Sequence, residues 1–304
     1  MTKKAILLLT AAFCLLVIPG PAVAGGKISL RLWGGWSYLA AGDVNAGTQA
    51  FFDWGKTYFA PLPGGTIEGG YEPLHGGYEF GGDVIFQLSP KIGVGIGAGY
   101  LQMSKDAPYT PMMTIMVDPF YGPEIDFTAS TKISAIPIRA SLFLSLPVSR
   151  KLDVTAHAGI SYYLQAEYHA DWFVDIPNEI WTGPFSSLTT AAEKKTAAIG
   201  LQGGLGVEYR FIRLLSLFLE AQGRYAKFKG FEGTSASVPG DYGGVLPSFS
   251  ETGKLYYESV PAIPGSPRWI MVQSAPPAGP GGTPREAAVD FSGVSFMAGI
   301  KIHF

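Results

Sequence analysis

The stretch Phe291-Ser292-Gly293-Val294-Ser295-Phe296-Met297-Ala298-Gly299-Ile300-Lys301-Ile302-His303-Phe304 alternates strictly between two kinds of residue. One face is apolar and carries Val294, Phe296, Ala298, Ile300, Ile302 and Phe304. The other face carries Gly293, Ser295, Met297, Gly299, Lys301 and His303. A period of two with one apolar side is typical of a β-strand whose two faces meet different surroundings. The stretch therefore predicts a strand, and it sets the pattern for the rest of the chain.

Seven further segments show the same alternation, at residues 27–38, 78–88, 92–100, 136–146, 152–167, 196–211 and 215–225. In each, a face of aliphatic and aromatic residues lies opposite a face of glycine, small polar and charged residues. A tilted strand needs ~9–11 residues to cross a bilayer, and these segments are long enough. Together with the C-terminal stretch they predict eight membrane-crossing strands. Pro137 is an exception within its strand, because proline donates no ladder hydrogen bond, and it predicts a local bulge or the end of regular pairing.

The connections between these strands alternate in length. Only a few residues join the second strand to the third, the fourth to the fifth and the sixth to the seventh. The other four links are long and cover residues 41–76, 104–131, 170–192 and 230–287. Short turns at one end and long loops at the other are typical of outer-membrane barrels, in which the long loops face outward. An even number of strands also closes the sheet without leaving a free edge.

The N-terminal residues have the pattern of a secretory signal peptide. Lys3 and Lys4 precede an apolar run over residues 5–18, and Ala22-Val23-Ala24 provides a small-x-small cleavage pattern. We expect residues 1–24 to be removed and residues 25–304 to form one barrel domain. The single cysteine, Cys14, lies in the expected signal peptide, so no disulfide is predicted for the exported chain.

Composition narrows the class further. Charged residues make up 15% of the chain, against the ~25% usual for soluble domains. Glycine is abundant, with 40 residues, and the net charge of -2 argues against a nucleic-acid partner. An exported chain that is poor in charge and has no apolar run of membrane-helix length fits a closed membrane barrel, since only helices and barrels satisfy the backbone in lipid.

On these patterns residues 25–304 resemble the small bacterial outer-membrane barrels of the OmpA, OmpX and OmpW class. The resemblance implies an all-β fold, an eight-stranded antiparallel up-and-down transmembrane β-barrel with long extracellular loops, in a bacterium with two membranes. It also implies outer-membrane lipid as a partner. In that family the terminal strand is the signal read by the barrel-assembly machinery. The residues that would carry this signal here are Phe296, Ile300, Ile302 and Phe304.

The predicted inner faces carry an unusual number of charges. The polar residues expected to form an interior network are Arg31, Glu79, Asp83, Arg139, Asp153, His157, Glu208, Arg210, Glu220, Arg224 and Lys301. An eight-stranded barrel is only wide enough to be filled by side chains, so opposite charges there should pair and plug it. A narrow path for ions or solutes is the alternative.

Catalytic motifs are absent from the sequence. His157 shares an inner face with Ser161, and His169 lies near Asp171, but none of these belongs to a recognisable motif. His75 and His303 have no zinc-ligand spacing. We therefore predict a non-enzymatic surface barrel without metal or cofactor, whose loops make extracellular contacts with an unidentified ligand. A passive channel for small or apolar solutes is the second hypothesis, and a lipid-modifying enzyme is the third.

Two long loops contain organised pieces. Residues 44–60 predict either an amphipathic helix, on the membrane interface or capping the pore, or an aromatic cluster that packs on itself. The loop from 230 to 287 is rich in proline, glycine and serine, and its Pro276-Pro277 and Pro280-Gly281-Gly282 predict irregular chain. Within it, we expect residues 269–272 to pair with residues 255–257 as a hairpin.

Overall fold

In a computed structural model, the structure describes residues 27–59, 66–105, 111–116, 124–175, 184–196, 198–239, 248–259, 268–276 and 285–304. The predicted signal peptide, including Cys14, lies outside the described residues, and its cleavage stays a prediction.

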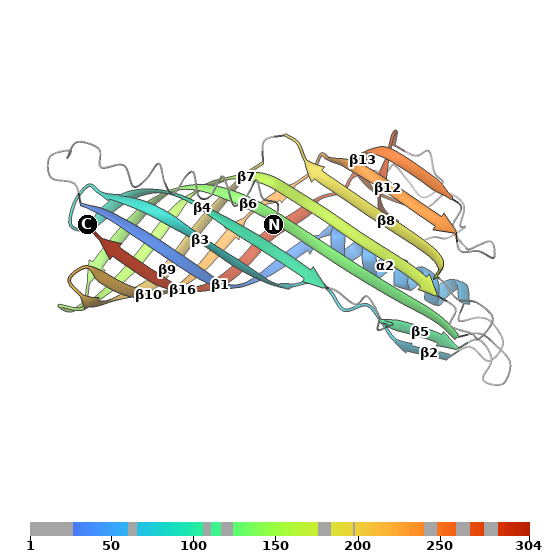
Figure 1. The fold of residues 1–304 in the computed structure, drawn as a ribbon, viewed down its shortest axis with the longest axis horizontal. Helices are drawn as coiled ribbons and strands as arrows, with labels where there is room; N and C mark the ends of the chain where they lie inside the picture. The colour runs from blue at the N-terminus through green and yellow to red at the C-terminus, as the bar shows by residue number, and fades with distance from the viewer. Residues whose placement is uncertain are drawn as a thin grey trace.

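Eight antiparallel strands close into a barrel (Figure 1). They are β1 (Ile28–Gly42), β3 (Gly76–Gln87), β4 (Ile92–Lys105), β6 (Glu124–Pro147), β7 (Leu152–Asp175), β9 (Ile199–Ile212), β10 (Leu215–Tyr225) and β16 (Val289–His303). Each pairs with the next in this order, and β16 pairs with β1 to close the ring. The predicted eight-stranded up-and-down barrel is therefore confirmed.

The short turns lie at one end of the barrel. They join β3 to β4, β6 to β7 and β9 to β10, and the C-terminus of the chain lies at the same end (Figure 1). Pro137 occupies a gap in the pairing of β4 with β6, which runs through Ala98 with Ile138 and resumes at Leu101 with Ala135. The gap is expected because proline has no N–H to donate to a ladder.

At the other end, the sheet continues well beyond the barrel. β6 and β7 are 24 residues long each, and further strands add to their outer halves. On the β7 side these are β8 (Pro184–Lys194), β12 (Phe231–Pro239), β13 (Phe249–Ser259) and β14 (Arg268–Gln273); on the β6 side they are β5 (Met113–Met116) and β2 (Thr66–Gly69). We call these strands, with the outer halves of β6 and β7, the outer sheet. Two short strands, β11 (Lys227–Phe228) and β15 (Arg285–Glu286), pair with β16 and β13.

The outer sheet corrects the prediction for the long links. Residues 230–287, predicted as a long link, contain three regular strands, β12, β13 and β14. Pro277 and residues 280–282, predicted to be irregular, lie outside the described residues. The predicted hairpin is confirmed, because Leu255 pairs with Val272 and Tyr257 with Ile270. Likewise, β6 begins within the predicted loop 104–131 and β7 ends within the predicted loop 170–192. Alternation continues in both, but its buried face packs against protein rather than lining a barrel.

A bulge in β7 exchanges the two faces of that strand. Gln165 has a positive φ of 47°, and the pairing with β6 shifts register between Ser134 and Ile136. Beyond the bulge, Glu167 and His169 are exposed, whereas Tyr168 is buried. Strict alternation over residues 152–167 predicts that Gln165 and Glu167 face the barrel interior with Asp153 and His157. This prediction is wrong for Gln165 and Glu167, which are exposed, because one extra residue moves every later side chain to the other face.

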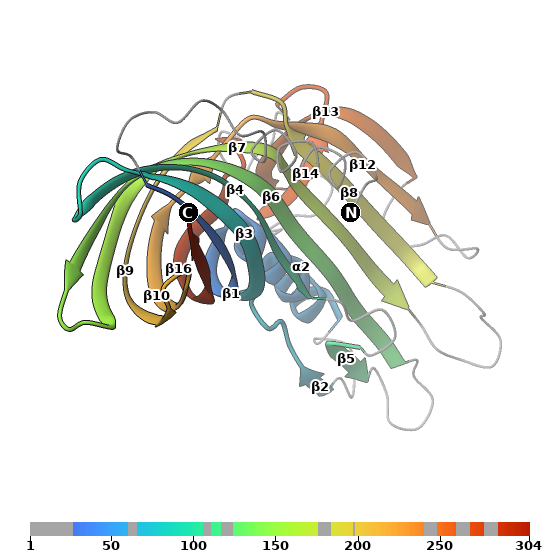
Figure 2. The same cartoon turned by 60° about the vertical axis from the view of Figure 1, so that its left-hand side comes forward.

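A helix, α2 (Asp43–Phe59), follows β1 directly and lies on the concave side of the outer sheet (Figure 2). It packs against β14 and also touches β1, β16, β5 and β6. Phe51, Phe52 and Trp54 are buried, and the ring of Phe51 stacks on Trp172 at 5.0 Å between centroids. The predicted helix and the predicted aromatic cluster thus both exist, and the helix lies within the protein rather than on the membrane interface. Among the described residues, no helix is both long enough and apolar enough to cross a membrane.

Asp43 connects the start of α2 to the segment that leads into β16 through hydrogen bonds. Its carboxylate accepts hydrogen bonds from the Arg285 guanidinium, at 2.5 and 2.7 Å, and from the backbone N–H of Ala288, at 2.7 Å. Burial alone would raise the pKa of Asp43, but the bonds from Arg285 and Ala288 outweigh burial and hold the pKa below its ordinary value.

We expect Asp43→Asn to destabilise the outer sheet by about 1.5–3 kcal/mol at neutral pH, the scale of hydrogen bonds to a charged group. Because the folded pKa lies below the unfolded one, this contribution is complete above the unfolded pKa and is lost as the pH falls through the folded pKa. The urea midpoint, followed by tryptophan fluorescence, should therefore differ between variant and wild type at neutral pH and converge in acid. A difference that does not change with pH would contradict the role assigned to Asp43.

Candidate functional site: the barrel lumen

The lumen carries a dense set of buried charges and is the candidate functional site. Nine of the predicted interior residues are buried there: Arg31, Glu79, Asp83, Arg139, His157, Glu208, Glu220, Arg224 and Lys301. The alternation of each strand turns these side chains inward, while the residues on either side of them face out. All nine have an oppositely charged or titratable partner.

The middle of the lumen is organised around Glu220 on β10. Its carboxylate accepts a hydrogen bond from Arg31 at 2.9 Å and lies 3.0 Å from His157 Nε2. The Arg31 guanidinium also lies 4.0 Å from the centroid of the Phe218 ring, a cation–π distance. Glu220 therefore joins β1 and β7 to β10 across intervening strands.

A second cluster forms around Asp83 on β3. It accepts hydrogen bonds from Arg139 at 2.7 Å and from the Trp33 indole at 3.1 Å. Arg139 also lies 4.2 Å from the centroid of the Trp33 ring and donates to Gln222 at 3.5 Å. Nearer the outer sheet, Arg224 on β10 donates to Glu79 on β3 and to Ser295.

Two of these contacts cross the lumen. Arg224 and Glu79 lie on β10 and β3, and Arg139 and Gln222 lie on β6 and β10. Within the ring of eight strands, each of these two strand pairs is separated by two other strands. The side chains therefore bridge the interior rather than following its wall, as expected for a barrel of this width.

The short-turn end of the lumen holds a further group. Glu208 Oε2 accepts a hydrogen bond from Lys301 at 2.8 Å, and Glu208 Oε1 lies 3.2 Å from His303 Nε2. Arg210 and Asp153 lie 3.4 Å apart at the rim, and the Arg210 side chain is 46% exposed. The prediction that Arg210 is an interior residue is therefore wrong for its guanidinium, because Arg210 lies two residues from the end of β9 and its long side chain reaches solvent.

Apolar side chains close the other end of the lumen. The rings of Tyr163, Phe228 and Phe291 lie 5.0 to 6.1 Å apart and are buried. They belong to the same hydrophobic core as the aromatic cluster around Phe51. The polar network is thus covered, on the side of the outer sheet, by packed protein.

His157 and Ser161, which share an inner face, have different hydrogen-bond partners. His157 contacts Glu220, whereas Ser161 donates to Gln202 at 2.9 Å. His169 and Asp171 are 2.9 Å apart but lie on the outer surface of β7 beyond the bulge. His75 lies against the Leu39 carbonyl, with its Nδ1 at 3.1 Å. Within the described ranges, no three His, Cys, Asp or Glu side chains gather in a way that could hold a metal ion.

The alternation of the strands places three aromatic residues on inner faces, but their contacts with the arginines were not predicted. Trp33, Phe143 and Phe218 face the lumen and contact the guanidinium groups of Arg139 and Arg31. The available signal was their position on faces that otherwise carry glycine, serine and charges. An aromatic ring on such a face has a cation as its natural partner.

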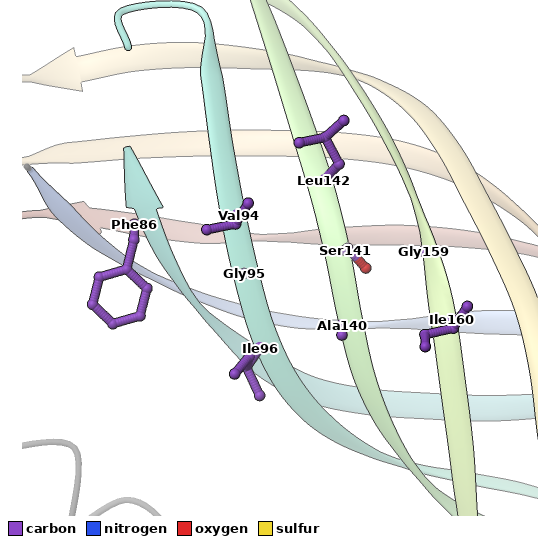
Figure 3. A pocket seen from close by; sticks show the side chains of 9 residues that line it. All are labelled: Phe86, Val94, Gly95, Ile96, Ala140, Ser141, Leu142, Gly159 and Ile160. Atoms are coloured by element: carbon purple, nitrogen blue, oxygen red, sulfur yellow. The ribbon is translucent and has the colours of Figure 1, made fainter. Parts of the chain in front are cut away.

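The outer surface of the barrel is apolar. Among the described residues, the exposed large apolar side chains lie on the eight ring strands and their short turns, with Ile67 of β2 as the exception. A depression in this surface lies over Ala140, between Leu142, Ile96 and Ile160 on three adjacent strands (Figure 3). It faces outward and has no charged residue in its lining, so it is separate from the lumen.

The predicted assembly-signal residues lie on the outward face of β16. Phe296, Ile300 and Phe304 are exposed, and Ile302 is half-buried. Their recognition by an assembly machinery stays a prediction.

No protein-family model matches the chain, and no curated protein matches it. Among solved structures it is similar to the outer membrane protein OprG from Pseudomonas aeruginosa, with 11% identity, a TM-score of 0.38, and coverage of 92% of this chain and 96% of that chain. It is also similar to a major outer membrane protein from Thermus thermophilus, with 14% identity, a TM-score of 0.39, and coverage of 92% and 100%. A third similar structure is the outer membrane protease OmpT from Escherichia coli, with 11% identity, a TM-score of 0.28, and coverage of 92% and 96%. The solved structures named here are thus all outer membrane proteins.

Proposed function

We propose that the chain is an integral outer-membrane barrel with a sealed lumen, which anchors the folded outer sheet outside the cell and has no enzymatic activity. The observation that carries this proposal is the charged network that crosses the lumen, with Arg224 bound to Glu79 and Arg139 to Gln222. Ions entering the lumen would have to break these buried pairs, and the apolar cap above them would have to open. The outer sheet then offers the surface for contacts with an unidentified extracellular partner.

The membrane assignment rests on the apolar outer surface. Side chains such as Ile96, Leu205 and Leu219 are more than half exposed. A protein that exposes an apolar surface of this extent would associate in water. Tyrosines follow at the edge near the outer sheet, where Tyr38 and Tyr78 on neighbouring strands are exposed. Tyrosine is favoured at the boundary between lipid and water, so this arrangement supports a membrane-spanning barrel.

Conductance distinguishes a sealed barrel from a passive channel. We expect the purified protein, reconstituted in a planar bilayer, to give no stable single-channel steps, while heat-modified migration on a gel verifies that it is folded. Stable steps from folded protein would reject the sealed lumen and favour the channel for small or apolar solutes. Turnover of lipid A or phospholipid would reject the non-enzymatic proposal.

Leu219 provides a test of the membrane assignment. It faces outward, is 61% exposed and lies near the middle of β10. We expect Leu219→Arg to destabilise the protein folded in bilayers by ~2–4 kcal/mol, the cost of arginine at the bilayer midplane. Urea titration in lipid vesicles would measure the change.

Thr252→Arg is the matched control for Leu219→Arg, because Thr252 is an exposed strand residue of the outer sheet. Its effect should stay within ~0.5 kcal/mol, as for ordinary surface substitutions. Equal losses in the two variants would mean that the barrel surface does not face hydrocarbon.

A further inference from the structure

The exposed charged side chains of the short turns and of the residue before β1 are all positive. Lys91 lies in the β3–β4 turn, Arg150 and Lys151 in the β6–β7 turn, Arg213 in the β9–β10 turn, and Lys27 just before β1. All five are exposed. Because the three turns and β1 are spread around the ring, these cations form a rim rather than a single patch. We call them the basic rim.

Acidic side chains do not neutralise the basic rim. The acidic side chains nearest to it along the ring strands are Asp153 and Glu208, which face the lumen and are already bonded to Arg210, Lys301 and His303. Among the described residues of the three short turns, none is acidic. The five rim cations outnumber the α-carboxylate of Phe304, which lies at the same end. The rim therefore carries an unbalanced positive charge, in a chain whose net charge is -2.

Two of the turns are built in the same way. Ser89 Oγ accepts from the backbone N–H groups of Lys91 at 3.3 Å and Ile92 at 3.1 Å. In the equivalent turn, Ser149 Oγ accepts from the Lys151 N–H at 3.3 Å. Each serine fixes the backbone of a lysine on a tight, ordered turn, so the charge is held at a defined height relative to the strands.

Exposed apolar residues lie directly beside these cations. Leu88 is 67% exposed, Val148 64% and Leu214 60%, and each lies within three residues of a rim cation. They continue the apolar surface of the barrel to its end. A cation beside an exposed apolar side chain matches the boundary of a bilayer, where acyl chains meet headgroups.

We propose that the basic rim binds the phosphate groups of anionic phospholipids in the leaflet that faces the short turns. This inference rests on the proposed membrane-spanning barrel. Lysine and arginine near an anionic membrane surface each contribute ~1 kcal/mol, and the exposed cations of the rim stand at the height of the headgroups. Zwitterionic lipids offer the same acyl chains without the net charge, so the rim selects for anionic headgroups.

The test is lipid retention by the full-length protein after folding. A variant with K91Q, R150Q, K151Q and R213Q removes most of the rim charge without touching the strands. The matched control carries K132Q, K195Q, K227Q and K229Q, which removes the same charge near the outer sheet. Each protein is offered an equal mixture of phosphatidylglycerol and phosphatidylcholine with identical chains, and native mass spectrometry counts the bound lipids.

We expect wild type and control to retain phosphatidylglycerol over phosphatidylcholine by ~5-fold or more, since 1 kcal/mol corresponds to about that factor. The rim variant should show no preference, and added salt should weaken the preference of the wild type. Equal preference in the rim variant and the wild type, or loss in the control instead, would overturn the proposal. Folding into phosphatidylcholine vesicles separates the two proposals: a wild type that folds there without lipid preference overturns only the rim, whereas one that fails to insert overturns the membrane barrel.

Discussion

Glu220→Ala should lower the free energy of unfolding by about 3–5 kcal/mol, the usual cost of removing one partner from a buried ion pair. The Glu220 side chain is 3% exposed and neutralises Arg31, which then has no carboxylate partner in a closed lumen. His157 loses its partner in the same step. Urea titration of the protein folded into lipid vesicles would measure the loss.

The control for this prediction is Glu68→Ala. Glu68 lies on the exposed strand β2 and should change stability by less than ~0.5 kcal/mol. A second variant, Arg31→Met combined with Glu220→Leu, removes both charges and should recover much of the loss, because replacing a buried pair by apolar residues is often neutral. If Glu220→Ala folds as stably as the wild type, Glu220 does not hold the lumen network together.

Phe51→Ala should destabilise the outer sheet by about 3–5 kcal/mol, the range for truncating a buried phenylalanine. Phe51 is 1% exposed, and its ring lies within 6 Å of the rings of Phe52, Phe127, Trp172 and Trp269. Removing it opens a cavity where α2 meets the strands. This cluster lies within the outer sheet, beyond the end of the barrel opposite the short turns. We therefore expect the outer sheet to become sensitive to chymotrypsin while the barrel remains resistant.

Phe173→Ala is the matched control, because Phe173 follows Trp172 on β7 and its side chain lies on the opposite, half-buried face. It should cost much less and leave the protease pattern unchanged. Simultaneous loss of barrel and outer sheet in Phe51→Ala would show that the two parts unfold as one unit, contrary to this prediction.

The barrel could be predicted from the sequence because each of its strands has one face toward an apolar exterior and the other toward a polar lumen. Residues such as Leu217 and Glu220 alternate between an apolar exterior and a polar lumen, and the side-chain period of a strand is two whatever its partners are. The short hairpin of β13 and β14 was readable for a related reason, since its two apolar pieces are close in sequence and few alternative pairings exist. Local pattern was sufficient in both cases.

The outer sheet was less readable, although its strands alternate as well. The shift of one residue at Gln165 reverses the faces of β7. No residue type in that segment predicts a bulge. Where residues 44–60 would lie was also undecided, because the aromatic face of α2 fits either lipid or protein. The outer sheet, through Phe127 of β6, Trp172 of β7 and Trp269 of β14, provides the surface that buries Phe51 and Trp54.

The sequence by itself therefore determined the number and order of the eight barrel strands and most of the residues that face the lumen, because these depend on alternation along one strand at a time. The tertiary structure alone decided which charges meet. Arg224 reaches Glu79, and Arg139 reaches Asp83 and Gln222, only because strand register and closure of the ring bring them to the same height. Register is a relation between distant segments, so no single strand contains it.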